Sequence, residues 1–238
     1  FKIVPDNVSL HQQLLGGDID LAEGLLPADL NRLKDAWEKG QSPIRPVNYL
    51  GRQYDFIGWN LVEPKCFQKL DKLPTNLKFN FAEWLIPHHL FGSQAVRAAL
   101  TMAIDRKKIT EIANTGQAIP MNGPVPPIIW AYNPAANKIW EYDPAHARKI
   151  LKAEGWRDID GDGILEKDGQ KFRFEMITNT GNVRRQHVLT LLQEQFKAVG
   201  VEMIPRPVDP GLFASRIIPT RDYDALLFGW SVGLKMEL

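Results

Sequence analysis

A chain of 238 residues with 44% apolar side chains can bury a sizeable core, either in one large domain or in two small ones. Its 29 Lys and Arg residues nearly balance its 28 Asp and Glu residues, and this balance, without a basic stripe among the aromatic residues, disfavours a nucleic-acid-binding protein. No apolar run approaches the roughly 20 residues of a membrane span, and the single cysteine, Cys66, excludes an internal disulfide.

Short strand-like segments alternate with helices over the first fifty residues. The strand-like segments are residues 1–4, 19–21 and 43–49. Helices are predicted at residues 8–15 and 27–39, and Pro27 suits the first turn of the second one. This alternation predicts an α/β arrangement.

A longer strand, rich in aromatic and β-branched residues, is predicted at residues 52–62. The next segment, residues 63–89, is punctuated by prolines and indicates an irregular excursion over the surface. A metal site at its adjacent histidines, His88 and His89, is disfavoured, because neighbours in sequence do not share a face and no carboxylate lies at a useful spacing. We therefore expect both to be surface histidines.

Two capped helices are predicted between residues 93 and 116. Ser93 suits the N-cap of the first and Asp105 that of the second, which Gly116 ends. The apolar residues of the first helix form one stripe that should face the core. The stripe consists of Val96, Ala99, Leu100, Ala103 and Ile104.

A proline-rich segment follows at residues 116–134. Its five prolines exclude a helix or a central strand, and its apolar residues, including Trp130, are too many for a free linker. We expect an ordered loop packed on the core. A third helix should then begin at an Asp143 cap, with Pro144 in its first turn.

The remaining segments complete a mixed α/β domain that extends from about Gly58 to Gly229. Residues 183–200 have the apolar periodicity of a strong helix, and the flanking segments alternate as strands do. The predicted elements are strands at 170–179, 201–208 and 223–230, the helix at 183–200 and a short helix at 211–218.

The sequence DIDGDGILEKDG at residues 158–169 raises the question of a calcium loop. An EF-hand loop needs oxygen ligands at alternate positions, a glycine at position 6 and a bidentate glutamate at position 12. Three aspartates and a glycine fit its first half, but Gly169 stands at position 12. We therefore favour a metal-free turn, in which aspartate side chains accept hydrogen bonds from backbone N–H groups and Gly161 and Gly163 have positive φ.

The order of six motifs along the chain is more specific than any single one of them. They are VRAALTMAIDRKKI, GQAIPMNGPVPPIIWAYNP, YDPAHARKILKAEGW, the Asp-rich corner, a helix ending in KAVGVEM, and DYDALLFGWSVG. This order resembles the oligopeptide- and dipeptide-binding family 5, the peptide/nickel-type substrate-binding proteins of ABC transporters. The resemblance extends from about Val8 to Gly233.

The resemblance implies an extracytoplasmic receptor, in the periplasm or at the cell surface, with an α/β, periplasmic binding protein type II-like fold. Members have two lobes that close on a small solute and deliver it to a membrane permease. They are longer than this chain, so we expect its C-terminal half. By this resemblance, residues 1–57 are part of the first lobe, residues 58–229 the second lobe, and residues 230–238 the truncated start of the return to the first.

The resemblance also implies where the solute binds. The family stretch that matches GWSVG supplies an aromatic wall and hydrogen bonds to the ligand, which carries over onto Trp230 and Ser231. The strand that matches FIGWN enters the second lobe beside the cleft, which nominates Trp59 and Asn60. The alternative for Trp230 is a core tryptophan at the end of a buried strand.

One position departs from the pattern of the peptide-binding members. They place an aspartate three residues after this tryptophan, where it pairs with the α-amine of the peptide, and here that residue is Gly233. Other members take nickel complexes, oligosaccharides or other small solutes. The resemblance therefore leaves the ligand open between a peptide and another small solute.

Two other classes of function find less support. A hydrolase is disfavoured because the five histidines lack spaced partners and no H-E-x-x-H motif or phosphate loop occurs. A calcium-dependent interaction module depends on the Asp-rich loop, which lacks its strongest ligand. We therefore expect a binding protein without catalytic residues, metal ligands or a cofactor.

Overall fold

The computed structural model describes residues 2–4, 6–66, 85–136 and 139–233. In the N-terminal segment, two helices form as expected, α1 (Asn7–Gly16) and α2 (Pro27–Glu38). Asp6 caps α1 by accepting a hydrogen bond from the backbone N–H of Ser9, and Gly17 ends the helix in the left-handed region.

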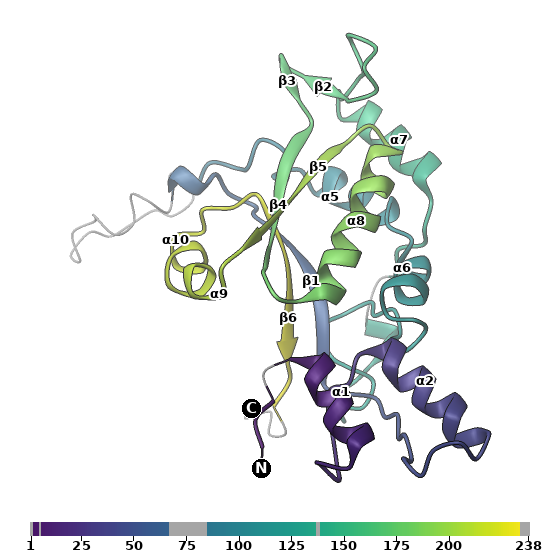
Figure 1. The fold of residues 1–238 in the computed structure, drawn as a ribbon. Helices are drawn as coiled ribbons and strands as arrows, with labels where there is room; N and C mark the ends of the chain where they lie inside the picture. Colours follow the sequence, from purple (N-terminus) through teal and green to yellow (C-terminus); the bar gives the residue numbers. More distant parts are fainter. Residues whose placement is uncertain (1, 5, 67–84, 137–138, 234–238) are drawn as a thin grey trace.

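A four-stranded sheet forms the centre of the molecule (Figure 1). Its strands, in spatial order, are β1 (Gln53–Trp59), β6 (Ala225–Ser231), β4 (Arg173–Asn179) and β5 (Glu202–Val208). β1 is antiparallel to β6 along its whole length, whereas β4 is parallel to both β5 and β6. A separate ribbon of β2 (Glu166–Lys167) and β3 (Gln170–Lys171) carries the Asp-rich corner at the end of the molecule opposite α1 and α2.

The predicted helices of the larger domain are confirmed, with their caps. They are α5 (Gln94–Met102), α6 (Arg106–Ala113), α7 (Pro144–Ala153) and α8 (Val183–Lys197). Each begins after a side chain that accepts a backbone N–H: the predicted caps Ser93, Asp105 and Asp143, and Asn182 before α8, for which the sequence analysis gave no cap. The proline-rich segment is an ordered loop that ends in the short 3₁₀ helix η1 (Pro134–Ala136).

The short helix predicted at residues 211–218 is part of a longer helical segment with a π-helical middle. It consists of α9 (Pro210–Leu212), η2 (Phe213–Ile217) and α10 (Ile218–Thr220). This segment covers one face of the sheet, where Phe213 and Ile217 pack with Leu226 of β6.

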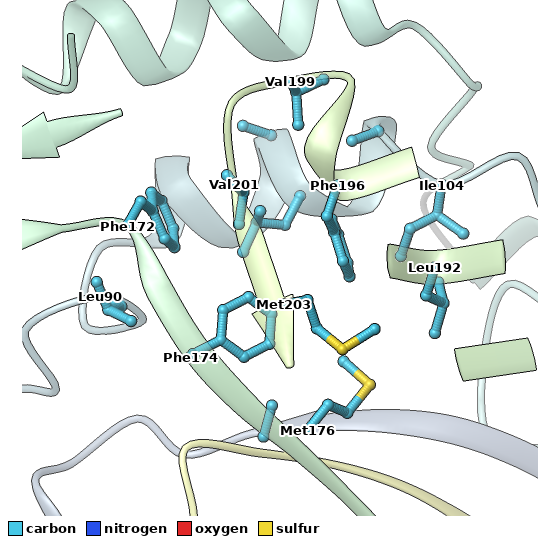
Figure 2. Close-up of a cluster of buried hydrophobic side chains, with 14 of the residues drawn as sticks. Leu90, Ile104, Phe172, Phe174, Met176, Leu192, Phe196, Val199, Val201 and Met203 are labelled. Atoms are coloured by element: carbon cyan, nitrogen blue, oxygen red, sulfur yellow. The ribbon is translucent and has the colours of Figure 1, made fainter. Parts of the chain in front are cut away.

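The main core lies on the other face of the sheet, beneath α8 (Figure 2). Phe174 and Met176 of β4 meet Leu192 and Phe196 of α8 there, and α5 and α7 add further apolar residues. Burial of one side chain such as Phe196 contributes roughly 1.5–3 kcal/mol. No helix in the described ranges has the length and apolar character needed to cross a bilayer.

Three short strand predictions are wrong. Residues 2–4, 19–21 and 43–49 form no strand, and Phe1 lies outside the described residues. The physical reason is the absence of a partner, because no strand in the described part of the chain lies beside them to pair their N–H and C=O groups. Of the predicted excursion at residues 63–89, residues 67–84 also lie outside the described ranges; at its base, Val62 pairs with Pro87 in an isolated bridge.

Candidate functional site

A groove of about 1110 Å³ lies at the end of the sheet where β6 terminates. The first turn of α8, the helix α6, the proline-rich loop and residues 48–51 also contribute to its lining. The lining mixes aromatic and aliphatic side chains with a few charged ones, as ligand sites commonly do. Its volume is slightly above the roughly 300–1,000 Å³ typical of small-molecule sites.

Trp230 and Ser231 both line this groove, from opposite faces of the sheet. Successive strand residues alternate between faces, and Leu227 belongs to the core beneath α8 whereas Leu226 and Phe228 pack on the opposite side. Continued to the end of β6, this alternation places Ser231 on the α8 face and Trp230 on the other. Trp230 is 60% exposed, so it lies outside the core that the described residues form.

Trp59 lies mainly in the core. Its ring packs against Phe91, Phe174 and Phe196, with centroid separations of 4.8, 5.9 and 6.2 Å. The part of Trp59 that is not covered by these rings contributes to the lining of the groove.

Asn60 is buried and does not line the groove. Its Nδ2 donates to the backbone carbonyls of Arg221, at 3.1 Å, and Tyr223, at 2.9 Å. Both amide hydrogens thus hold the end of β1 against the turn that precedes β6. These contacts give Asn60 a positioning role.

An ion-pair network that no sequence pattern predicted lies in the groove, centred on Asp55 of β1. Asp55 Oδ1 accepts hydrogen bonds from Arg185 Nε, at 3.1 Å, and Arg185 Nη2, at 2.9 Å. Its Oδ2 accepts one from Arg184 Nη2, at 2.7 Å. Arg185 Nη1 also donates to Asn179 Oδ1, at 2.6 Å, and its guanidinium lies 5.2 Å from the centre of the Phe228 ring.

Gly229 makes room for this network. It lies directly opposite Asp55 in the β1–β6 pairing. A Cβ atom at this position would lie 2.1 Å from Arg185 Nη2 and 2.5 Å from Asp55 Oδ1. The missing side chain therefore lets Arg185 reach across β6 to its partner.

The position of the two arginines was the available signal for this network. Arg184 and Arg185 stand in the first turn of α8, where the helix dipole disfavours cations. Such a pair indicates nearby anionic partners, although the sequence does not say which carboxylate supplies them.

Residues 229–233 read GWSVG, which also fits the G-x-S-x-G spacing of serine hydrolases. A catalytic serine needs a histidine within hydrogen-bond reach. Among the described residues that line the groove there is no histidine. The spacing therefore carries no support for a hydrolase.

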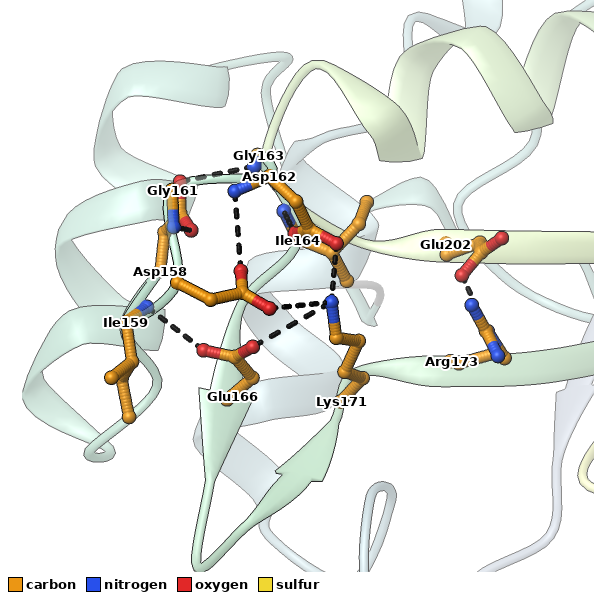
Figure 3. A network of polar contacts seen from close by, with 11 residues as sticks. Asp158, Ile159, Gly161, Asp162, Gly163, Ile164, Glu166, Lys171, Arg173 and Glu202 are labelled. Atoms are coloured by element: carbon orange, nitrogen blue, oxygen red, sulfur yellow. Dashed lines mark hydrogen bonds and ion pairs between the residues drawn. The ribbon is translucent and has the colours of Figure 1, made fainter.

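The Asp-rich corner has the predicted turn geometry (Figure 3). The carboxylate of Asp158 accepts the N–H groups of Gly161 and Gly163, and those two glycines have φ of 79° and 87°. Lys171, which the turn motif did not predict, places its ammonium among the carboxylates of Asp160, Asp162 and Glu166. Its hydrogen bonds to Asp162 and Asp160 raise the pKa of Lys171, so the corner contains its own cation.

Replacing Asp160 with alanine should change stability only slightly. The carboxylate, which is itself half exposed, accepts one backbone N–H, from Asp162, and one bond from the ammonium of the half-buried Lys171. We expect the melting temperature to fall by no more than about 4 °C, and EGTA to leave wild-type melting unchanged. Scanning fluorimetry with and without chelator tests this, and a drop of many degrees in EGTA would instead show that calcium holds the corner.

The prediction of two surface histidines is wrong for His88. His88 is buried, and its Nε2 lies 3.2 Å from Asp224 Oδ1, while its Nδ1 accepts the backbone N–H of Leu90 at 3.2 Å. His89 is exposed, and Glu63 Oε1 lies 2.9 Å from its Nδ1. Glu63, His88 and His89 are close enough to hold a metal ion, but both ring nitrogens of His88 already have protein partners.

Acidification should weaken the contacts that Asp224 and Glu63 make with the two histidines. Burial alone would raise the pKa of Asp224, but hydrogen bonds from His88 and the backbone N–H of Glu175 outweigh it and hold the pKa below its usual value. Burial would also raise the pKa of Glu63, but hydrogen bonds from the backbone N–H and the ring of His89 outweigh it and lower that pKa. Because both pKa values are lower in the folded chain, their stabilisation is present above the unfolded values of about 4 and is lost as the pH falls through the folded ones.

We therefore expect the free energy of unfolding to fall steeply below about pH 4. Asp224→Asn should flatten that dependence, because a neutral amide loses nothing on acidification. Urea titrations between pH 7 and pH 3 measure the slope. Asp35→Asn, at an exposed position of α2, controls for the loss of one charge. Equal slopes for the two variants would show that the pH dependence does not come from Asp224.

Comparison with known proteins identifies relatives along nearly the whole chain. The profile of the family described as "Bacterial extracellular solute-binding proteins, family 5 Middle" matches residues 1–235. The oligopeptide-binding protein AppA of Bacillus subtilis is 30% identical over 234 residues, which cover 98% of this chain but 37% of AppA. The chain thus spans well under half the length of this relative.

Solved structures share the fold. The AppA of Bacillus subtilis in complex with a nonapeptide superposes with a TM-score of 0.70 at 30% identity, over 97% of this chain and 40% of that one. NikA of Brucella suis in complex with Fe(III)-EDTA gives a TM-score of 0.75 at 19% identity, over 99% of this chain and 42% of that one. The expected α/β, periplasmic binding protein type II-like fold is confirmed.

Proposed function

Because this chain belongs to the family 5 bacterial extracellular solute-binding proteins, we propose that it is part of a receptor for an ABC importer. The receptor captures a peptide or another small solute between two lobes, outside the cytoplasm, and delivers it to the membrane permease. The observation that best supports this proposal is the groove at the end of β6, with the exposed Trp230 in its lining. The role is binding, with no catalytic residue and no nucleic-acid partner.

We assign residues 1–57 to the first lobe, residues 58–229 to the second, and residues 230–238 to the start of the return, of which 234–238 lie outside the described residues. Exposed apolar side chains before residue 57 support this division. Ile3 is 94% exposed, Leu21 is 87% and Val47 is 64%. The remainder of the first lobe would cover these side chains and supply the strand partners that residues 2–4 and 19–21 lack.

Within the groove, Trp230 and Ser231 contact the solute, the first as an aromatic surface and the second through its hydroxyl group. Trp59 supports the groove floor from the core, and Asn60 positions the crossover without touching the solute. An aromatic wall replaces water on the ligand, and a few fixed polar groups orient it.

The ligand class stays open between a peptide and another small solute. The solved structure of AppA is a complex with a nonapeptide and that of NikA a complex with Fe(III)-EDTA, and a relative 32% identical over 130 residues is the glutathione-binding protein of Salmonella typhimurium. At Gly233, where peptide binders of the family carry an aspartate, this chain offers no carboxylate to an α-amine.

A solute screen on the full-length protein tests the proposed function. Peptides of two to nine residues, glutathione, oligosaccharides and metal chelates are added singly, and melting is followed. A true ligand stabilises by mass action, by about 2.7 kcal/mol at a hundredfold excess over its Kd. Stabilisation by one solute class supports a receptor, and no stabilisation by any class would contradict it.

A further inference from the structure

We propose that a chain of side-chain hydrogen bonds holds the two lobes in their closed arrangement before a solute binds. Its members are Asn31 and Asn48 of the first lobe and Thr115 and Gln117 of the second, and we call these four residues the latch. This inference rests on the proposed function, in which residues 1–57 and 58–229 belong to different lobes. It adds a control of lobe closure that uses protein groups alone.

Asn31 is the centre of the latch, on α2 and next to the C-terminal end of α6 (Figure 1). Its Nδ2 donates to Thr115 Oγ1, at 3.2 Å, and to the backbone carbonyl of Thr115, at 3.4 Å. Its Oδ1 accepts a hydrogen bond from Gln117 Nε2, at 2.5 Å. Gln117 Oε1 in turn accepts one from Asn48 Nδ2, so four hydrogen bonds join the two lobes here.

The backbone at Thr115 supports a functional role for this contact. Thr115 has a φ of 47° and Gly116 a φ of 75°, so two consecutive residues after α6 are in the left-handed region. Glycine adopts this conformation readily, but a β-branched residue does so rarely and only where surrounding contacts hold it. Asn31 supplies two such contacts. The turn therefore presents a carbonyl and a hydroxyl group to α2, and the turn and the contact stabilise each other.

The latch borders the groove without filling it. Asn48 and Gln117 line the groove, from the first and the second lobe, whereas Asn31 and Thr115 do not. Asn48 and Gln117 also line a smaller cavity of about 370 Å³ on the α2 side, so the hydrogen bond between them lies in the wall that separates the two spaces. Asn31 is thus a positioning residue, which influences closure without touching the solute.

The chemistry of the latch suits a moderate bias that a solute can still overcome. A neutral hydrogen bond shifts an equilibrium by only about 2- to 12-fold, because water replaces each partner when the contact opens. Three of the four bonds end on Asn31, so the latch should favour the closed arrangement by about 10-fold or more. The bonds join amide, hydroxyl and carbonyl groups, which are uncharged, so added salt should leave this bias unchanged.

The test measures the distance between the lobes in the full-length protein without any solute. Dyes on Asp35→Cys and Lys149→Cys, at exposed positions of α2 and α7, report this distance by single-molecule FRET, and the buried Cys66 stays unlabelled. We expect the labelled parent to show a closed population both in low salt and in 1 M NaCl. Asn31→Ala should lower the ratio of closed to open molecules by about 10-fold.

Gln117→Ala should lower the ratio to a similar extent. The double variant Asn31→Ala/Gln117→Ala should add little to either single change, because the two residues share a hydrogen bond and belong to one chain. Gln12→Ala, at an exposed position of α1, is the matched control and should leave the ratio unchanged. Urea unfolding of each variant shows that it is folded.

An unchanged ratio in Asn31→Ala, or a parent without a closed population, would overturn the latch. Fully additive effects in the double variant would do the same. If Asn31→Ala does not fold, the comparison of Gln117→Ala with the parent is decisive. Because the measurement needs no solute, the solute screen decides separately whether the proposed function stands.

Discussion

Replacing Trp230 with alanine in the full-length protein is expected to weaken solute binding by about 2 kcal/mol, roughly 30-fold, with little loss of stability. The reason is its exposure. With 60% of its surface uncovered, the ring contributes little to the core, yet it borders the groove where a solute would displace water from it. Calorimetry with the best solute of the screen, together with urea unfolding, separates the two effects.

Two other tryptophans provide matched controls. Trp156 is 4% exposed and packs on Phe172 with a centroid separation of 4.4 Å, so Trp156→Ala should cost about 3–5 kcal/mol of stability. Trp130 is 74% exposed but does not line the groove, so Trp130→Ala should change neither stability nor affinity. A Trp230→Ala variant that behaved like either control would remove Trp230 from the ligand site.

Replacing Asp55 with alanine is expected to lower the free energy of unfolding by about 3 kcal/mol. The change removes the carboxylate that binds two guanidinium groups and leaves Arg185 buried without its counter-ion. Because a quarter of the Asp55 side chain remains accessible to water, we place the effect at the low end of the range for broken buried pairs. Urea unfolding of the single variant measures it.

A double variant shows whether the cost comes from the unpaired charge. In Asp55→Ala/Arg185→Leu no buried cation remains, so most of the lost stability should return. Gly229→Ala, whose added Cβ would collide with Arg185 Nη2, should destabilise the wild type but have less effect when Arg185 is leucine. If the changes in the free energy of unfolding simply added in these double variants, a network centred on Asp55 would be contradicted.

Features with local signals were predictable from the sequence. The N-caps at Ser93, Asp105 and Asp143 bind backbone groups three residues away, so the pattern and the contact lie in the same short segment. The alternation of Phe172, Phe174 and Met176 likewise anticipated the buried face of β4. The turn of the Asp-rich corner also forms from neighbouring residues, although Lys171, which offsets part of its negative charge, lies nine residues beyond Asp162.

Only the tertiary structure decided which distant residues meet. Asp55 and Arg185 are 130 residues apart, and their contact depends on the β1–β6 register, which places Gly229 opposite Asp55. The burial of His88 depends in the same way on Asp224, 136 residues away. By itself, the sequence determined the helices, the main strands and the family of this protein, because those depend on periodicity, caps and motif order. The groove and its charge network depend on strand pairing between segments that carry no mutual signal in the sequence.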